Sequence, residues 1–300
     1  MTTSDIRPFG GVLAPVVTTF DDRTGELHEA AFQSNVRAHL DAGIDGIVVA
    51  GSTGEAALLD ERERRQLLEW ARAIVPDDTW LIAGAGAEST RSTIARCGDA
   101  AERGAIAALV VAPHYYGAAM TPDALAHHYR AVADASPIPL VLYNIPKYMH
   151  FSLAPALVAE LSAHGNIVGI KDSSGDLDLI KGYLETQSDR FTVLTGHGGS
   201  LLQALQLGAR GGILAVALFA APIAVEIHEA FRRGDVARAR SAQDRLAPLA
   251  KAIVAGLGVA GVKAAMDVVG LRGGAVRSPL RAVGEEERKA IAAMMLVVAS

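Results

Sequence analysis

The segment Asn166–Asp176, with the sequence NIVGIKDSSGD, decides how the rest of the chain is interpreted. Its first half, Ile167–Ile170, is apolar apart from one glycine, which is typical of a parallel strand buried on both faces. Lys171 ends this strand, and the residues after it are turn and helix-cap types. A lysine at the end of a buried strand is costly unless it is paired or neutral, so Lys171 requires an explanation.

Two explanations for Lys171 are open at this point. As an amine nucleophile, it would condense with a substrate carbonyl, and this role needs low-polarity surroundings because lysine in water is almost fully protonated at neutral pH. Ile170 and Val168 would supply part of that environment. As a structural residue, Lys171 would instead pair with the neighbouring Asp172 or extend to the rim of the fold.

The overall composition excludes several classes of protein. Half of the 300 residues are hydrophobic, which provides ample core for one or two domains. The net charge of -5 leaves no basic excess, so a nucleic-acid partner is not expected. A single cysteine, Cys97, excludes an internal disulfide and a cysteine metal cluster, and fits a reducing cytoplasm. Residues 1–8 lack an apolar signal core, and the run Ile213–Val225, broken by Pro222, is too short to span a bilayer, so no membrane role is expected.

Short apolar runs alternate with segments of helical period along most of the chain. The expected strands are Val12–Thr19, Gly46–Ala50, Trp80–Gly84, Ala108–Ala112, Leu140–Asn144, Ile167–Lys171, Phe191–Thr195 and Gly212–Val216. The expected helices between and after them are Leu27–Ala42, Glu61–Val75, Thr90–Arg103, Pro122–Ala135, Ala154–Ala163, Asp178–Glu185, Ser200–Leu207 and Pro222–Arg232. This alternation predicts an α/β fold, a (β/α)₈ TIM barrel over residues 1–233.

Residues 234–300 exceed what the barrel needs and predict a C-terminal helical extension. Its helices are expected at Val236–Val254, Val259–Gly270 and Glu285–Val298. The extension would serve a partner or oligomer interface, or contribute to the site. The alternative fold, a doubly wound open sheet, would need a glycine-rich phosphate loop after its first strand, and the chain has the polar turn Phe20–Gly25 there.

Catalytic groups of a TIM barrel lie at the carboxyl ends of its strands. Polar residues gather at these positions in the sequence: Ser52, Thr53, His114, Tyr115, Tyr116, Tyr143, Lys171, Ser173 and His197. Ser52 and Thr53, flanked by glycines, suit a carboxylate cradle or an ordinary turn. Tyr143 would transfer protons, or pack as an amphipathic core residue.

Two other kinds of site are disfavoured. His114 and His197 lack the carboxylate or histidine spacing of a metal centre, so no metal is expected. A serine hydrolase would carry a Gly-x-Ser-x-Gly elbow, whereas Ser52 lies in Gly-Ser-Thr-Gly. A lysine amine with tyrosine and hydroxyl partners accounts for more of this face.

Three motifs at these strand ends resemble a known family. Gly51–Glu55 (GSTGE), Tyr143–Pro146 (YNIP) and Gly169–Asp172 (GIKD) match, in order and spacing, signatures of the dihydrodipicolinate synthase / N-acetylneuraminate lyase family. These proteins are pyruvate-handling class I aldolases on a (β/α)₈ barrel. The resemblance implies a Schiff-base lyase, a 2-oxo acid substrate and no cofactor beyond the covalent imine. It also implies a cytoplasmic homotetramer, a dimer of dimers, or a homodimer.

The resemblance assigns roles to individual residues. Lys171 would form the imine, and Tyr143 would shuttle protons. Tyr115 would reach into a neighbouring subunit's site and complete a proton relay with Thr53. The residues implied to contact the substrate are Ser52, Thr53, Ser173, Gly196 and Ile213.

The reaction within the family is less determined. Tyr148 stands where dihydrodipicolinate synthases carry an arginine for the second substrate, and Lys147 would replace it only as a point charge. Other stretches resemble 4-hydroxy-2-oxoglutarate aldolase: Ala83–Thr90, His127–Tyr129, Ser136–Pro139, Lys171–Ser173, Gly261–Asp267 and Gly273–Gly274. We therefore expect a 4-hydroxy-2-oxoglutarate aldolase-like enzyme first, and second the synthase that condenses pyruvate with aspartate semialdehyde. A sugar-acid lyase or dehydratase is third, and a catalytically silent 2-oxo acid-binding barrel is the alternative without turnover.

Overall fold

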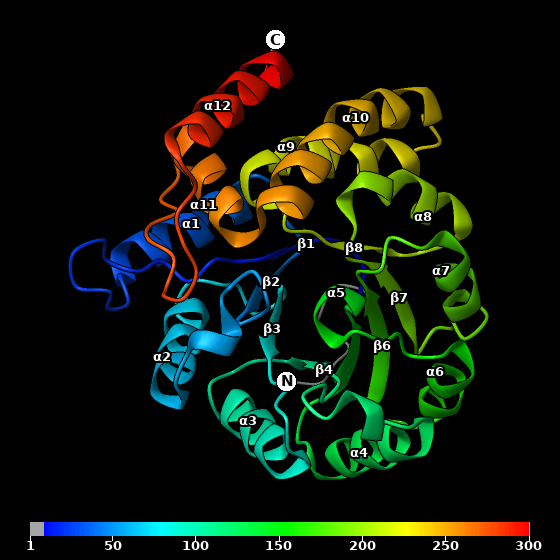
Figure 1. Cartoon of the computed structure of the whole chain (residues 1–300). Coiled ribbons are helices and arrows are strands. Elements are labelled where there is room, and N and C mark those ends of the chain that lie inside the picture. Colours follow the sequence, from blue (N-terminus) through cyan, green and yellow to red (C-terminus); the bar gives the residue numbers. More distant parts are fainter. Residues whose placement is uncertain (1–8, 300) are drawn as a thin grey trace.

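The computed structural model describes residues 9–299 and contains a closed barrel of parallel strands in chain order (Figure 1). The strands are β1 (Gly11–Pro15), β2 (Gly46–Val49), β3 (Trp80–Gly84), β4 (Ala107–Val111), β5 (Leu140–Asn144), β6 (Ile167–Asp172), β7 (Thr192–Thr195) and β8 (Gly211–Ile213). The last strand pairs with the first, with Ile213 opposite Leu13, so the sheet closes on itself. The predicted TIM barrel is confirmed.

Helices form a ring around the strands in Figure 1. They are α1 (Glu29–Asp41), α2 (Glu61–Arg72), α3 (Thr90–Glu102), α4 (Pro122–Ala135), α6 (Pro155–Ser162), α7 (Leu177–Leu184), α8 (Leu201–Leu207) and α9 (Ala217–Arg232). On β1 to β3, alternate residues join two different apolar clusters: Leu13, Val48 and Ile82 belong to one, and Val12, Ile47 and Leu81 to the other. The side chains of a strand point alternately to its two faces, so one set fills the barrel and the other packs against the helices.

The first strand is shorter than the expected Val12–Thr19. The amide of Val16 still donates to the carbonyl of Val48 at 3.0 Å. Beyond this residue the strand has ended, and the Thr18 side chain donates its hydroxyl to the carbonyl of Gly54 at 2.6 Å. Residues 16–19 are fully buried, so their apolar character reflects burial of a loop rather than a strand.

The last barrel unit also differs from the prediction. The chain turns immediately after Ile213, because the amide of Ala217 donates to the carbonyl of Leu214 at 3.1 Å. Helix α9 therefore begins at Ala217 rather than at the expected Pro222. A non-helical residue, Ala220, precedes the proline and kinks the helix there.

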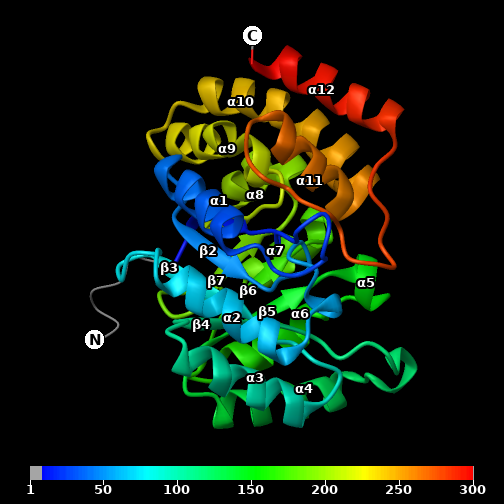
Figure 2. The ribbon, with the colours of Figure 1, turned by 90° about the vertical axis from the view of Figure 1, so that its left-hand side faces the viewer.

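The C-terminal extension contains α10 (Val236–Leu249), the π-helix η5 (Ala250–Leu257), α11 (Gly258–Val268) and α12 (Glu285–Ala299). A single helix was expected over Val236–Val254, and the π-helical turns were not predicted. The continuous stretch Val236–Val268 is long and apolar enough to cross a membrane, but half of its most apolar window is buried within the fold. Helix α10 lies beside α9 in both ribbon views, so this stretch is a packed helix of the domain (Figures 1 and 2).

Two segments of the chain cover the carboxyl ends of the strands. The short helix α5 (Pro146–Met149), which was not predicted, lies in front of the barrel in Figure 1. In Figure 2 the connection from α11 to α12 descends on the same side of the molecule as α5. Residues from the extension therefore reach the face on which the predicted site lies.

Candidate active site

Lys171 lies inside the barrel against an aromatic ring. Its side chain is 5% exposed, and its Nζ lies 4.2 Å from the centre of the Tyr143 ring. The register of β5 and β6 places Tyr143 directly opposite Lys171, and in β7 the opposite residue is Leu194. Ile170 was expected to form part of the apolar wall, but it alternates with Lys171 in the regular part of the strand and faces its other side, so this expectation is wrong for Ile170.

Asp172 does not pair with Lys171, so the pairing that the structural explanation offered for this lysine is wrong. The Asp172 carboxylate, which is fully buried, accepts hydrogen bonds from the Asn144 amide and the Ser174 hydroxyl, each at 2.6 Å. Burial raises the pKa of Asp172, and these hydrogen bonds oppose the rise. Among residues 9–299 no carboxylate or hydrogen-bond partner contacts the Lys171 amine, which leaves it available to a ligand.

Gly196 is in direct contact with two of the predicted site residues. A Cβ atom at this position would lie 1.9 Å from Ser173 Oγ and 2.9 Å from Lys171 Cε. Any side chain would therefore overlap Ser173 and crowd the lysine, so glycine at this position allows close packing rather than an unusual backbone conformation. Ile213 is fully buried opposite Leu13, on the same rim of the barrel. The structure thus brings Lys171, Tyr143, Ser173 and Gly196 together.

Ser52 and Thr53 lie on a tightly constrained turn after β2. The residues on either side of the turn, Ala50 and Glu55, both have left-handed backbone conformations, with φ of 53° and 58°. Such conformations are rare for residues other than glycine and persist only where neighbouring contacts hold them. The hydroxyls of Ser52 and Thr53 are half-buried, and no hydrogen-bond partner for them lies in the part of the chain that the structure describes.

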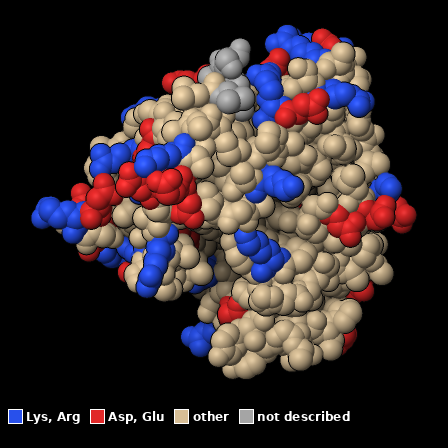
Figure 3. Space-filling view, turned by 45° about the horizontal axis from the view of Figure 1, so that its top comes forward, with Lys and Arg blue, Asp and Glu red and all other residues tan. Residues whose placement is uncertain are grey.

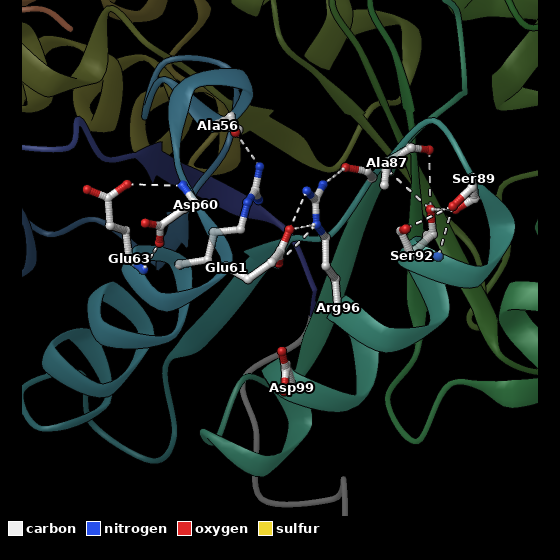
Figure 4. A network of polar contacts seen from close by, with 12 residues as sticks. Ala56, Asp60, Glu61, Glu63, Ala87, Ser89, Ser92, Arg96 and Asp99 are labelled. Atoms are coloured by element: carbon white, nitrogen blue, oxygen red, sulfur yellow. Dashed lines mark hydrogen bonds and ion pairs between the residues drawn. The ribbon is translucent and has the colours of Figure 1, made fainter.

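Two arginines donate to backbone carbonyls of this connection and of the next one, between β3 and α3. Arg64 donates to the carbonyl of Ala56, just beyond the turn, and to that of Gly84 at the end of β3. Arg96 of α3 pairs with Glu61 at 2.6 Å and donates to the carbonyl of Gly86 (Figure 4). These contacts fix the loops on the side of the barrel where Ser52 and Thr53 lie.

Tyr115 does not join the other site residues within one chain. Its side chain is 77% exposed and packs edge-on against Tyr116, with 5.0 Å between the ring centres. The carboxylate of Glu88 accepts the amides of His114 and Tyr115, both at 2.9 Å, and holds this loop in place. The outcome is an ordered pair of exposed tyrosines at the edge of the catalytic face.

Three features of this face depend on elements or contacts that the sequence did not predict, namely α5, η5 and the surroundings of Lys263. Tyr148 of α5 is 42% exposed, and the burial of the rest of its side chain together with the nearby Tyr143 raises its pKa. Lys147 Nζ lies 6.0 Å from the centre of the Tyr148 ring and donates to the carbonyl of Ala255 in η5, so the π-helix borders the mouth of the barrel. The third feature is Lys263, the one lysine in an otherwise apolar run of α11, a signal of the same kind as that at Lys171.

The distribution of surface charge and the side chains available as metal ligands narrow the type of site. Acidic and basic side chains are interspersed over the face in Figure 3, which shows no extended basic surface. Within residues 9–299, no group of three or more histidine, cysteine or acidic side chains is placed to hold a metal ion. An unpaired amine against a tyrosine, at the carboxyl ends of adjacent barrel strands, is the arrangement of Schiff-base lyases.

The comparisons with known proteins agree with this class. The model of the dihydrodipicolinate synthetase family matches residues 8–297, and the chain belongs to this family. Its members are class I Schiff-base enzymes that use pyruvate without an external cofactor, so this protein is an enzyme of the pyruvate-dependent aldolase and lyase group.

Relatives of known name are similar over nearly their whole length. The 4-hydroxy-tetrahydrodipicolinate synthase of Methanothrix thermoacetophila is 38% identical over 281 residues, covering 93% of each chain. The synthase of Methanopyrus kandleri is 35% identical, again over 93% of each chain. Among solved structures, dihydrodipicolinate synthase DapA-2 of Bacillus anthracis has a TM-score of 0.92 and 31% identity, covering 97% of this chain and 98% of its own. YagE of E. coli K12, in complex with pyruvate, has a TM-score of 0.92 and 28% identity, covering 98% and 99%.

Proposed function

We propose that Lys171 attacks the carbonyl carbon of pyruvate, loses water and forms a protonated imine. The observation that carries the proposal is the buried, unpaired amine 4.2 Å from the Tyr143 ring. The imine withdraws electrons from the adjacent methyl carbon, which loses a proton to give an enamine, and the enamine attacks an aldehyde. Tyr143 is suited to pass protons because its phenol belongs to the ring that contacts the amine. No cofactor is needed beyond the covalent imine.

The substrate carboxylate would bind at the turn after β2. Ser52 and Thr53 offer hydroxyls without protein partners, and the flanking glycines leave their amides approachable. Ser173, Gly196 and Ile213 would line the remainder of the site, with Gly196 leaving room beside the imine carbon. This arrangement needs no metal ion.

For the overall reaction, we infer condensation of pyruvate with aspartate semialdehyde as the first candidate. The relatives at 33–38% identity are named 4-hydroxy-tetrahydrodipicolinate synthase, and this reverses the order expected from the sequence. The second candidate, cleavage of 4-hydroxy-2-oxoglutarate, is favoured by one observation. Tyr148 lacks the positive charge that the resemblance assigns to this position, and the ammonium group of Lys147 lies 6.0 Å from the centre of its ring.

We further propose a cytoplasmic homo-oligomer, either a tetramer built as a dimer of dimers or a dimer. The exposed pair Tyr115 and Tyr116 supports an interface at this edge, where Tyr115 would enter the partner's site and complete a relay with Thr53. One solved relative is described as a monomeric dihydrodipicolinate synthase variant, so the assembly needs direct measurement by light scattering. In this proposal residues 1–233 carry the chemistry and residues 234–300 support it.

Reduction with borohydride tests the chemistry. We expect incubation with pyruvate and borohydride to add one reduced pyruvate to the peptide that contains Lys171, as read by mass spectrometry. A wild-type protein without this adduct would contradict the imine mechanism. A parallel assay then compares condensation with aspartate semialdehyde, pyruvate release from 4-hydroxy-2-oxoglutarate, and turnover of sugar acids. Adduct formation without turnover of any of these substrates would favour a silent 2-oxo acid-binding barrel.

A further inference from the structure

A second buried lysine lies close to the turn that carries Ser52 and Thr53. The Nζ of Lys263, from α11, is 2.5 Å from a carboxylate oxygen of Glu55, and the two side chains are 2% and 0% exposed. The same ammonium donates to the carbonyl of Ala275 and lies 4.8 Å from the centre of the Phe20 ring. Both charges are therefore buried, paired and hydrogen-bonded, so the extension is bonded directly to the end of the turn.

The second oxygen of the Glu55 carboxylate is also held by the extension. It accepts the backbone amide of Arg277 at 2.8 Å. The Arg277 guanidinium lies 4.1 Å from the centre of the Phe20 ring, on which Lys263 also packs, and binds Glu63 through two hydrogen bonds of 2.6 and 2.7 Å. Glu63 forms the capping box that begins α2 with Asp60 (Figure 4). The extension is thus bonded to the turn through Glu55 and to the start of α2 through Glu63.

The conformation of Glu55 depends on these contacts. Its φ of 58° is left-handed, and its amide donates to the carbonyl of Ser52 at 3.1 Å to close the turn. A glutamate in this conformation needs tertiary contacts to keep it there. Because Glu55 is two residues beyond Thr53, a change in its backbone would redirect the Thr53 hydroxyl, and a displacement of about 1 Å is enough to lower a rate substantially.

We propose that Lys263 and Glu55 are positioning residues for catalysis, which set the direction of the Ser52 and Thr53 hydroxyls through the buried ion pair between α11 and the turn. The inference rests on the proposed function, in which these hydroxyls hold the substrate carboxylate and relay protons. It assigns to the C-terminal extension a direct influence on the catalytic step in the same chain.

The test compares two single variants with their combination. Glu55→Gln keeps the size and the acceptor for the Arg277 amide, and Lys263→Met keeps an unbranched chain of similar length. We expect each to lower kcat about 10–100-fold, while pyruvate and borohydride still label Lys171. The double variant, Glu55→Gln with Lys263→Met, leaves no unpaired charge in the core, so its unfolding midpoint in urea should recover toward wild type while kcat stays low.

That separation of stability from turnover distinguishes positioning from a structural role. Recovery of kcat together with the urea midpoint in the double variant would overturn the proposal, as would wild-type kcat in the single variants. Leu246→Ala is the matched control, because Leu246 is a fully buried residue of α10 and its loss destabilises the extension without touching the pair. It should lower the urea midpoint and leave kcat near wild type; an equal loss of kcat would also overturn the proposal. Absence of the pyruvate adduct in the wild type would mark failure of the imine mechanism itself.

Discussion

The two buried lysines of this protein have opposite surroundings. Lys171 is 5% exposed, faces a tyrosine ring and has no acidic partner in the described part of the chain. Lys263 is 2% exposed, also packs on an aromatic ring, but binds Glu55 and a backbone carbonyl. Burial lowers the pKa of Lys263, and the Glu55 carboxylate opposes that change. An unpaired amine is free to react, whereas a paired one holds two segments together.

Proximity in sequence does not decide which lysine is paired. Asp172 is adjacent to Lys171 in the chain, yet strand alternation turns its carboxylate to Asn144 and Ser174. Glu55 belongs to the second βα unit and Lys263 to the extension, yet their side chains are in contact. The difference teaches that the fold, rather than adjacency in the chain, decides which lysine has an acidic partner.

The largest expected effect is the loss of turnover in Lys171→Ala. Without the amine no imine forms, so kcat should fall by about 10⁴-fold or more, and borohydride with pyruvate should leave the protein unlabelled. The urea midpoint should be unchanged or higher, because the substitution removes a buried amine that has no partner. Lys181→Ala, at an exposed ion pair with Asp178, is the control and should retain full activity. Turnover at the wild-type rate in Lys171→Ala would show that the reaction does not use Lys171.

Lys263→Met should show the reverse pattern in stability. It leaves the Glu55 carboxylate buried without its counter-charge, and the loss of one partner of such a pair costs about 3–5 kcal/mol. The free energy of unfolding, measured in urea, should fall by that order, in contrast to Lys171→Ala. Equal stability of the two lysine variants would contradict the distinction drawn between them.

Gly196→Ala would crowd the unpaired lysine without removing it. The new Cβ would overlap Ser173 Oγ and press on Lys171 Cε, so kcat should fall about 10–100-fold. Gly98→Ala is the matched control, since its Cβ meets no atom within 4 Å and lies within α3. Alanine favours a helix over glycine, so that variant should be slightly more stable and fully active. Wild-type kinetics in Gly196→Ala would show that this contact does not constrain the lysine.

Tyr115→Phe tests whether the reaction at Lys171 requires a tyrosine from a second subunit. If Tyr115 relays protons in a partner's site, loss of its hydroxyl should lower kcat about tenfold or more with a smaller change in KM. Tyr116→Phe should be close to wild type. A change confined to KM would instead assign Tyr115 to substrate binding.

A smaller effect extends the comparison to a buried histidine. His39 is buried without a partner for its Nε2 among the described residues, and burial lowers its pKa to about 4. The unfolded chain takes up this proton near pH 6.5, before the folded protein does, so stability is present above pH 6.5 and is lost as pH falls toward 4. The loss should be about 3 kcal/mol, and His39→Gln should weaken this acid dependence in urea unfolding. If the stability of His39→Gln depends on pH as that of the wild type does, the acid-induced loss of stability comes from other groups.

The strand ends were predictable because barrel strands carry strong local signals. Buried parallel strands are continuous apolar runs, so Lys171, Tyr143 and Ser52 could be placed at carboxyl ends before any tertiary contact was known. Boundaries were less predictable where burial and strand character coincide, as in residues 16–19. The short helix α5 and the π-helix η5 were missed because neither has a distinctive periodic signal of its own.

The amino-acid sequence alone determined the alternation of strands and helices, the barrel and the presence of a lysine near the carboxyl end of β6. These follow from apolar periodicity and from residue chemistry, which are local properties. Only the tertiary structure decided that Asp172 turns away from Lys171, that Glu55 receives Lys263 as its partner, and that Tyr115 remains outside the site of its own chain. Those outcomes depend on strand direction and on contacts between segments distant in the chain, which no local pattern specifies.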